Sequence, residues 1–286
     1  MTAGNRPFRQ ITDIPFLPVS FFKTHRVVHT GHLVHTIFES SSTSGSGISQ
    51  HLVYDTELYH KSYSRGFELV YGPAGNYRLL CLLPGYMDRE HSSLVYMCRG
   101  LVQRGMPGSG LFSRANSDFL EALKDSEATA TPTLLLGVTH ALLSLAEQWQ
   151  GPILKHTLIM ETGGMKGHGP ERVRAEIHEI LCTKLGVNHI HSEYGMTELL
   201  SQAYSKGNGI FRSPPWMQVL IQDATDPGTW LPAGKTGRIC VVDLANVYSC
   251  SFIATDDLGK LHPNGSFEVL GRLDFSDVRG CNLMMG

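Results

Sequence analysis

The chain has 286 residues, which fits one large α/β domain or a main domain with a small appendage. Its 24 basic and 26 acidic residues give a formal net charge of −2 without runs of like charge, which argues against a nucleic-acid or anionic-membrane surface. The six cysteines are scattered without a Cys-x-x-Cys pair, a usage typical of reduced proteins and not of disulfide or zinc frameworks. No stretch reaches the roughly eighteen apolar residues of a membrane span, so we expect a cytoplasmic protein with small-molecule or protein partners.

The least ordinary segment, residues 40–47, is rich in hydroxyl side chains and glycine and follows the apolar run 33–38. This order predicts a strand that ends in a loop whose backbone N–H groups and hydroxyls can surround a phosphate. The alternative is a solvated Ser/Gly turn or linker, which is the commoner meaning of this composition. It is not a Walker A motif, because no Gly-Lys-Ser/Thr follows.

Alternating strands and helices are predicted next. Apolar spacing indicates a helix over 55–71, stopped by Gly72, then a strand over 77–83 and a helix over 92–102. The loop 86–91 therefore lies at a strand's carboxyl end, where ligands collect in open α/β sheets. Residues 105–110 read as a surface loop.

The same alternation of strands and helices is predicted toward the middle of the chain. We predict a short helix over 118–124 capped by Ser117, a strand over 133–136, a helix over 141–149 and a strand over 153–160. Pro170 opens a further helix that ends at Gly186. Its predicted inner face consists of Val173, Ile177, Ile180, Leu181 and Leu185. A strand over 187–191 follows and leads into a loop at 192–198.

Two of these loops carry the candidate chemistry. One has Gly163 and Gly164, and the neighbouring one has Tyr194, Thr197 and Glu198. An aromatic ring, a hydroxyl and a carboxylate suit an adenine base, a phosphate and Mg²⁺ respectively. The alternative, equally consistent with the pattern, is a packed Tyr194 and a loop-capping Glu198.

Beyond residue 210 the helical pattern stops. Strands are predicted over 216–221, 237–242 and 266–270, with acidic turns at 254–259 and 271–274. We expect an antiparallel or barrel-like subdomain. The predicted fold class is therefore α/β, with a layered, parallel-rich sheet, flanking helices and a smaller C-terminal β subdomain.

In their order along the chain, these segments resemble the adenylate-forming superfamily of acyl-CoA synthetases and ligases. Residues 40–47 correspond to the family's pyrophosphate loop and 161–164 to its adenine-contacting glycine turn. The Tyr-Gly-Met-Thr-Glu sequence at 194–198 matches the family's core motif, and 255–257 correspond to its Thr-Gly-Asp. Within the superfamily, the segments around 18–25, 160–167 and 192–204 are most similar to the branch of phenylacetate–CoA ligase and the LuxE-type acyl-protein synthetase of bacterial luminescence.

The resemblance implies ATP-dependent activation of a carboxylic acid, fatty or other, as an acyl-adenylate, followed by transfer to a thiol. It implies ATP and Mg²⁺, with CoA, a carrier protein or another thiol-bearing protein as acceptor. Thr197 and Glu198 would be catalytic, with Glu198 as the metal ligand. The implied nucleotide contacts are Ser42, Thr43, Ser44, Gly45, Ser46, Gly47, Gly163, Gly164, Tyr194, Gly195, Asp257 and Arg272. The implied acyl-site residues are Tyr86, Arg89, His91, Gly137 and His140.

Two departures from the family pattern favour a second hypothesis. The lysine that usually ends the phosphate loop is replaced by residues 48–51, and the chain stops six residues after Gly280, where the family's C-terminal domain would begin. We expect residues 1–210 to form the nucleotide- and acyl-binding core and 211–286 a β-rich subdomain that ends at the hinge. The alternative function is a catalytically reduced nucleotide- or CoA-binding module. A serine hydrolase is disfavoured because no Gly-x-Ser-x-Gly elbow occurs.

Overall fold

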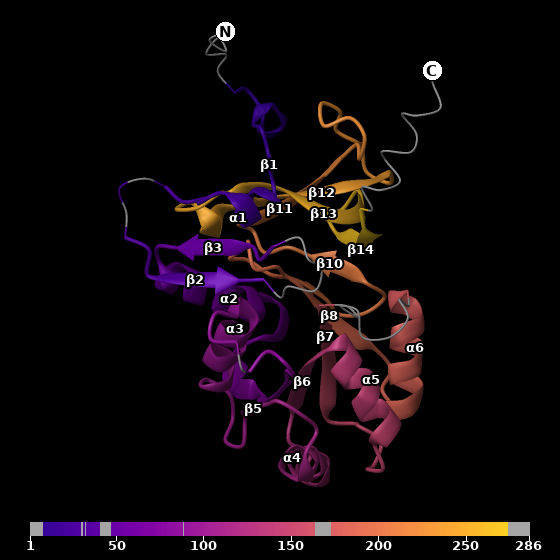
Figure 1. Cartoon of the computed structure of the whole chain (residues 1–286). Helices are drawn as coiled ribbons and strands as arrows, with labels where there is room; N and C mark the ends of the chain where they lie inside the picture. Colours follow the sequence, from indigo (N-terminus) through magenta and orange to yellow (C-terminus); the bar gives the residue numbers. More distant parts are fainter. Residues whose placement is uncertain are drawn as a thin grey trace.

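A single mixed sheet runs through the protein, and its two halves differ in strand direction (Figure 1). The computed structural model describes residues 8–29, 31, 33–40, 47–87, 89–163 and 173–273. Within them the sheet has 12 strands, in the order β11-β12-β13-β14-β10-β9-β8-β7-β6-β4-β5, with β1 paired to β13.

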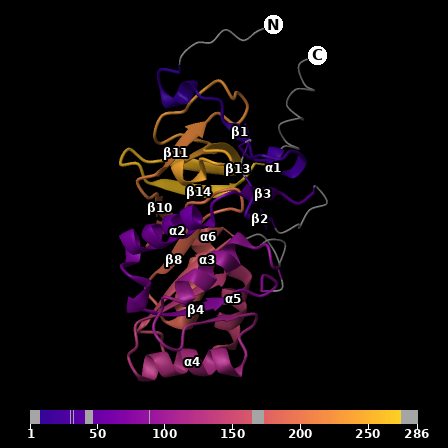
Figure 2. The same ribbon diagram turned by 90° about the vertical axis from the view of Figure 1, so that its left-hand side faces the viewer.

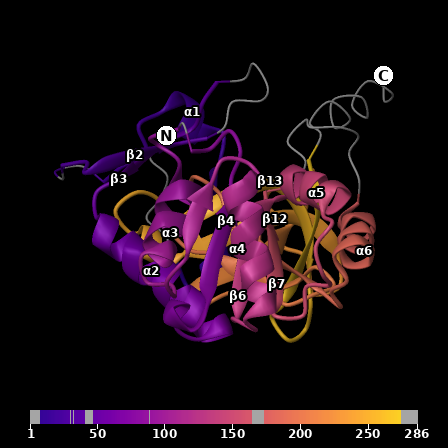
Figure 3. The same ribbon diagram turned by 90° about the horizontal axis from the view of Figure 1, so that it is seen from below.

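The parallel half consists of β5, β4, β6, β7 and β8, joined by helices. Its elements are β4 (Arg78–Leu82), α3 (Ser93–Val102), β5 (Gly110–Phe112), α4 (Ser117–Ala128), β6 (Thr133–Val138), α5 (Thr139–Gln148), β7 (Thr157–Thr162), α6 (Arg174–Leu185) and β8 (Ile190–Tyr194). Seen from below, α3 and the preceding α2 (Thr56–Tyr71) lie on one side of these strands, and α5 and α6 lie on the other (Figure 3). Burial on both faces explains why the strands read as nearly continuous apolar runs.

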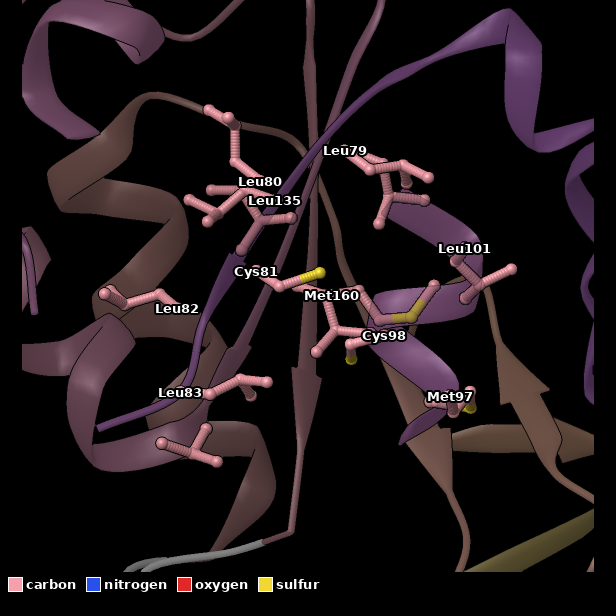
Figure 4. Close-up of a cluster of buried hydrophobic side chains, with 14 of the residues drawn as sticks. Leu79, Leu80, Cys81, Leu82, Leu83, Met97, Cys98, Leu101, Leu135 and Met160 are labelled. Carbon is pink, nitrogen blue, oxygen red and sulfur yellow. The ribbon is translucent and has the colours of Figure 1, made fainter. Parts of the chain in front are cut away.

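Leucine-rich strands build the main core. Leu79, Leu80, Cys81, Leu82 and Leu83 are each at most 1% exposed. They pack with Met97, Cys98 and Leu101 of α3 and with residues of β6 and β7 (Figure 4). This core fixes the carboxyl ends of the parallel strands, and those ends face the second half of the sheet.

The antiparallel half lies at one end of the molecule, above the parallel half in Figures 1 and 2. It is made of β9 (Ala203–Ser205), β10 (Ile210–Arg212), β11 (Met217–Gln222), β12 (Thr236–Asp243), β13 (Phe252–Leu261) and β14 (Phe267–Arg272). A second buried cluster joins this half to the first, because it contains Tyr194 and Leu199 from the parallel side as well as Phe211, Ile239 and Phe267.

The N-terminal segments pack at the junction of the two halves. β1 (Leu17–Pro18) runs parallel to β13 and is followed by the short helix α1 (Phe21–Thr24). β2 (Thr36–Glu39) and β3 (Gln50–Val53) form a separate antiparallel pair. Three 3₁₀ turns complete the described elements: η1 (Ile11–Asp13), η2 (Ala74–Asn76) and η3 (Leu244–Asn246). Among the described helices, none is both long enough and apolar enough to cross a membrane.

The predicted α/β fold class is confirmed, and several elements confirm the sequence patterns in detail. Helix α2 begins after Asp55, whose side chain accepts hydrogen bonds from the backbone N–H groups of Glu57 and Leu58. It ends at Gly72, as predicted. Helix α6 ends at Gly186 in the left-handed conformation, with φ of 71°.

Other boundaries were wrong. The N-cap of α4 is Asn116, which accepts a hydrogen bond from the N–H of Phe119, and not Ser117. β8 extends to Tyr194, so residues 192–194 belong to a strand and not to a loop. Val173 precedes α6 and is 71% exposed, which removes it from the inner face. Residues 254–259, predicted as a turn, lie within β13. The predicted loop at 105–110 is confirmed for residues 105–109, and only Gly110 belongs to the edge strand β5.

Candidate active site

The loop that follows β8 contains the 194–198 motif and is held by a buried carboxylate. Asp243, at the end of β12, is 0% exposed. One of its oxygens accepts hydrogen bonds from the N–H groups of Leu200 (2.8 Å) and Ser201 (3.0 Å), and the other accepts from the Ser201 hydroxyl (2.6 Å) and the Ala245 N–H (3.1 Å). Burial raises the pKa of Asp243, against the lowering effect of these hydrogen bonds. Asp243, at the end of a strand in the antiparallel half, thus fixes the turn that follows β8 in the parallel half.

A buried histidine ties the same loop to the β2–β3 hairpin. The Nδ1 atom of His51 lies 2.8 Å from the carbonyl oxygen of Thr197, and its Nε2 atom lies 3.0 Å from Oδ1 of Asn246. Asn246 in turn donates a hydrogen bond from Nδ2 to the carbonyl oxygen of Glu198 at 2.8 Å. Burial lowers the pKa of His51 to about 4, although both facing oxygens favour the protonated ring. The ring is therefore neutral at physiological pH, and its single N–H donates to one of the two facing oxygens.

The hairpin also brings the stem of the hydroxyl-rich loop to Glu198. The Ser40 N–H donates to the Ser49 carbonyl at 3.1 Å, and the Ser49 N–H donates to the Ser40 hydroxyl at 2.9 Å. Glu198 is only 5% exposed. Burial raises the pKa of its carboxyl, while a hydrogen bond from Ser49 lowers it. The loop itself, including Ser42, Thr43, Ser44, Gly45 and Ser46, lies outside the described residues, and Gly47 is its first described position on the far side.

Tyr194 links the two halves through its hydroxyl, which donates to Oδ2 of Asp257 in β13 at 2.9 Å. Its ring is 8% exposed and makes T-shaped contacts with Phe211 and Phe267. Arg272, paired opposite Asp257 in β14, places its Nε 3.8 Å from Oδ1 of that carboxylate. Burial raises the pKa of Asp257, against the Tyr194 hydrogen bond and the charge of Arg272.

The end of β7 lies beside the end of β8, since Thr162 is in register with Glu193. Gly163, directly after Thr162, has φ of 81°, a left-handed conformation that favours glycine. Gly164 lies outside the described residues. The hydroxyl-loop stem, the β7 end and the 194–198 motif therefore meet at one edge of the sheet.

Arg174, at the start of α6, was not singled out from the sequence and braces this edge. Its Nε donates to Glu161 at 3.0 Å, a second nitrogen donates to the Val269 carbonyl at 3.1 Å, and the guanidinium lies over the Phe211 ring. Burial by itself would raise the pKa of Glu161. A hydrogen bond from His178 and the charge of Arg174 outweigh it, so this pKa lies below its ordinary value.

A small pocket opens between the ends of β7 and β8 and the start of α3, with a volume of about 80 Å³. Of the predicted acyl-site residues, Tyr86 and Arg89 line it, together with Gly163, Gly195 and Thr197 of the predicted nucleotide and catalytic set. His91, Gly137 and His140 are not among the described lining residues. The pocket also has polar lining residues that sequence reasoning missed, namely Glu39, Ser92, Ser93, Thr162, Glu193 and Gln202.

No protein-family model and no curated protein matches the chain significantly. Among solved structures, ATP-bound MatB from Rhodopseudomonas palustris superposes with a TM-score of 0.61 at 18% identity, over 84% of this chain and 48% of that one. The AMP complex of o-succinylbenzoate coenzyme A synthetase (MenE) from Bacillus subtilis gives 0.59 at 20% identity, over 85% and 50%. The amide bond synthetase McbA from Marinactinospora thermotolerans gives 0.59 at 18%, over 84% and 49%.

This chain has the fold of the N-terminal domain of adenylate-forming enzymes. It spans about half the length of the solved structures it matches. At these identities the likeness concerns the fold alone, so the roles of individual residues rest on the geometry of this chain.

Proposed function

We propose that this chain binds ATP and a carboxylic acid at the junction of its two half-sheets and converts them to an acyl-adenylate and pyrophosphate. The observation that carries the proposal is the convergence of two carboxylates on opposite ends of the 194–198 motif, beside the stem of a hydroxyl-rich loop: Glu198, which is buried, and Asp257, whose side chain is 15% exposed. Buried carboxylates are costly unless they are paired or have a ligand to bind.

The nucleotide fits the donors and acceptors of this edge. Asp257, held by Tyr194, would accept hydrogen bonds from the ribose hydroxyls. Thr197 would contact the phosphates, and residues 42–47 would hold the departing pyrophosphate. Gly163, exposed and in a left-handed conformation, leaves room for an adenine edge.

Glu198 suits a magnesium site, because Mg²⁺ is usually held by one or two carboxylates together with substrate phosphates. No cluster of three or more His, Cys, Asp or Glu side chains that could hold a metal occurs among the described residues. Bound there, Mg²⁺ would neutralise phosphate charge.

In the proposed reaction, a carboxylate oxygen of the acid forms a bond to the α-phosphorus of ATP, and the bond from that phosphorus to the pyrophosphate oxygen breaks. Pyrophosphate leaves with the electron pair. The loop fixed by Asp243 and His51 holds Thr197 and Glu198 in place before ATP arrives, so little reorganisation is needed during the reaction.

We further propose transfer of the acyl group to an external thiol, as in an acyl-protein synthetase or a CoA ligase. The thiol sulfur would attack the acyl carbonyl and lose its proton, and AMP would leave. Among the described cysteines, burial raises the thiol pKa of Cys182, Cys240 and Cys250, which disfavours the reactive thiolate at these positions. The pKa of the fully buried Cys98 is also raised, by a hydrogen bond with Cys81 and by burial. Cys281 lies outside the described residues.

A nucleotide-binding module without catalysis is the second candidate, favoured by residues 48–51 in place of a loop lysine. Two lysines are candidates to replace that cation. Lys166 lies outside the described residues, and Lys260 is paired with Glu268 at 2.8 Å.

The test combines calorimetric ATP binding with ATP–pyrophosphate exchange over a panel of carboxylic acids. Asp257→Asn should weaken ATP binding, while Asp256→Asn, which alters the next side chain along β13 on its other face, should leave it unchanged. Exchange that is lost in Glu198→Gln supports the ligase. ATP binding without exchange for any acid supports the binding module, and absence of ATP binding refutes both.

A further inference from the structure

We propose that the pocket between β7, β8 and α3 selects a short carboxylic acid whose chain carries a hydrogen-bond donor, recognised by Gln202 and Glu193. This inference rests on the proposed function, because it takes the pocket to be the acyl site. It departs from the fatty acyl chain that the sequence resemblance implies.

The first argument is an unsatisfied acceptor. Gln202 is 4% exposed and lines the pocket, and its buried Oε1 atom has no hydrogen-bond partner in the described part of the structure. Buried polar atoms are nearly always paired in native proteins, so an isolated one beside a cavity indicates a group that arrives with a ligand. The partner of a carbonyl oxygen must be a donor.

The second argument is a buried carboxylate in the same wall. Glu193 is 8% exposed, lines the pocket and accepts a hydrogen bond from the Thr162 hydroxyl. A Cβ atom at position 195 would collide with Oε1 of Glu193, so Gly195 allows the carboxylate to lie against the backbone of the motif. Its negative charge contributes, after burial, to the raised pKa values of Tyr59 and Tyr204. An acid with a second carboxylate would be repelled here, whereas a hydroxyl or ammonium group would be attracted.

The third argument is size. A volume of about 80 Å³ lies well below the roughly 300–1,000 Å³ of typical small-molecule pockets. Tyr59 and Met97, both at most 2% exposed, bound it from α2 and α3. Tyr59 is further held by its hydroxyl, which donates to the Ser93 carbonyl at 3.1 Å. A long alkyl chain would have to displace these packed side chains and would leave Oε1 of Gln202 without a donor.

The experiment measures acid binding by calorimetry, with the whole chain saturated by the non-hydrolysable analogue α,β-methylene-ATP. The acids are butyrate, 3-hydroxybutyrate, 3-aminobutyrate and octanoate. We expect the hydroxy or amino acid to bind about tenfold or more tightly than butyrate, and octanoate to bind no better than butyrate. This comparison uses the unaltered chain, so it does not depend on the folding of any variant.

Two variants show which side chains recognise the donor group of the acid. Gln202→Leu should abolish the discrimination between 3-hydroxybutyrate and butyrate, and the matched control Gln148→Leu, on the exposed side of α5, should keep it. Glu193→Gln preserves shape and removes charge, so it should weaken 3-aminobutyrate more than 3-hydroxybutyrate. If the hydroxy acid is favoured and Glu193→Gln has no selective effect, the recognised donor is a hydroxyl.

Failure of this inference and failure of the proposed function give different results. Absence of binding by the ATP analogue would refute the proposed function and the inference with it. Binding of the analogue together with a preference for butyrate or octanoate, or with no measurable acid binding, would overturn the inference alone.

Discussion

The parallel and antiparallel halves of the sheet contribute to the candidate site in different ways. From the parallel half come side chains at strand ends that line the pocket, such as Thr162 and Glu193. From the antiparallel half come Asp243 and Asn246, which lie behind the motif loop and hold its backbone. One half therefore supplies groups that can recognise an acid, and the other fixes the geometry of the proposed catalytic loop.

This division predicts which substitutions affect stability and which affect ligand choice. Changes among the anchors should lower the free energy of unfolding and the affinity for nucleotide together, because the motif loop depends on them. Changes among the pocket residues should alter the choice of acid with a smaller effect on nucleotide binding. Stability and nucleotide-binding measurements on variants of both groups test this division.

Asp243→Asn should have the largest effect. Each carboxylate oxygen accepts two donors, so replacing either oxygen by an NH₂ group leaves two donors unpaired. With about 2 kcal/mol for each, the free energy of unfolding should fall by about 4 kcal/mol. Urea denaturation followed by circular dichroism measures this change.

The matched control is Asp223→Asn. Asp223 accepts three hydrogen bonds, from Thr225 and Asp226, but its position is partly exposed, so water can reach the donors that its substitution leaves unpaired. Its substitution should change stability little. Equal losses for the two variants would contradict the role given to Asp243.

The second prediction concerns pH and His51. Its pKa is about 4 in the folded protein and about 6.5 when unfolded, so between these values the unfolded state binds more protons. Stability from this group is therefore present above pH 6.5 and is lost as pH falls toward 4, by about 3 kcal/mol. The stability cost of His51→Leu, which removes the one N–H that a neutral ring donates to these two oxygens, should be about 2 kcal/mol at pH 7, should vanish near about pH 5 and should reverse its sign toward pH 4.

The difference in free energy of unfolding between wild type and His51→Leu isolates the contribution of the histidine. The raised pKa values of Glu198, Asp243 and Asp257 affect both proteins and cancel in this difference. The control His35→Leu lies on the same hairpin segment but is exposed and should show no such pH dependence. A stability difference between wild type and His51→Leu that stays constant from pH 7 to pH 4 would rule out a neutral, buried ring.

The sequence predicted best those elements whose signals are local. Apolar periodicity with Asp55 and Gly72 at its ends located α2, and continuous apolar runs located β4 and β6. β13 was missed because Asp256, Asp257 and Gly259 are poor strand formers. Pairing with both β12 and β14 stabilises them there, and those partners are not visible in local sequence.

The candidate site divides in the same way. The 194–198 motif and the hydroxyl-rich loop could be recognised as patterns. Their anchors could not, because His51 and Asn246 are 195 residues apart and meet only in the folded chain. Gln202 carries no sequence signal either, since its importance comes from an acceptor buried without a partner.

Arg174 in α6 contacts both halves of the sheet, so its substitution shows how much stability the junction between them contributes. Arg174→Lys keeps the charge but loses the planar group that contacts Glu161, the Val269 carbonyl and the Phe211 ring together. The free energy of unfolding should fall by about 1.5 kcal/mol, as measured by urea denaturation. Arg212→Lys, at an exposed position of β10, is the matched control and should change little. An equally small change at Arg174 would mean that the two half-sheets do not depend on it.

The smallest predicted effect separates contacts across the junction from contacts within one half. Tyr194→Phe removes one hydrogen bond to Asp257, and Tyr77→Phe removes one to the Tyr71 carbonyl inside the parallel half. Each should cost about 1 kcal/mol of stability. Only Tyr194→Phe should also weaken ATP binding, because it releases the carboxylate proposed to hold the ribose. Calorimetry with ATP distinguishes them: if both variants bind ATP equally well, the contact between Tyr194 and Asp257 supports the fold and has no part in nucleotide recognition.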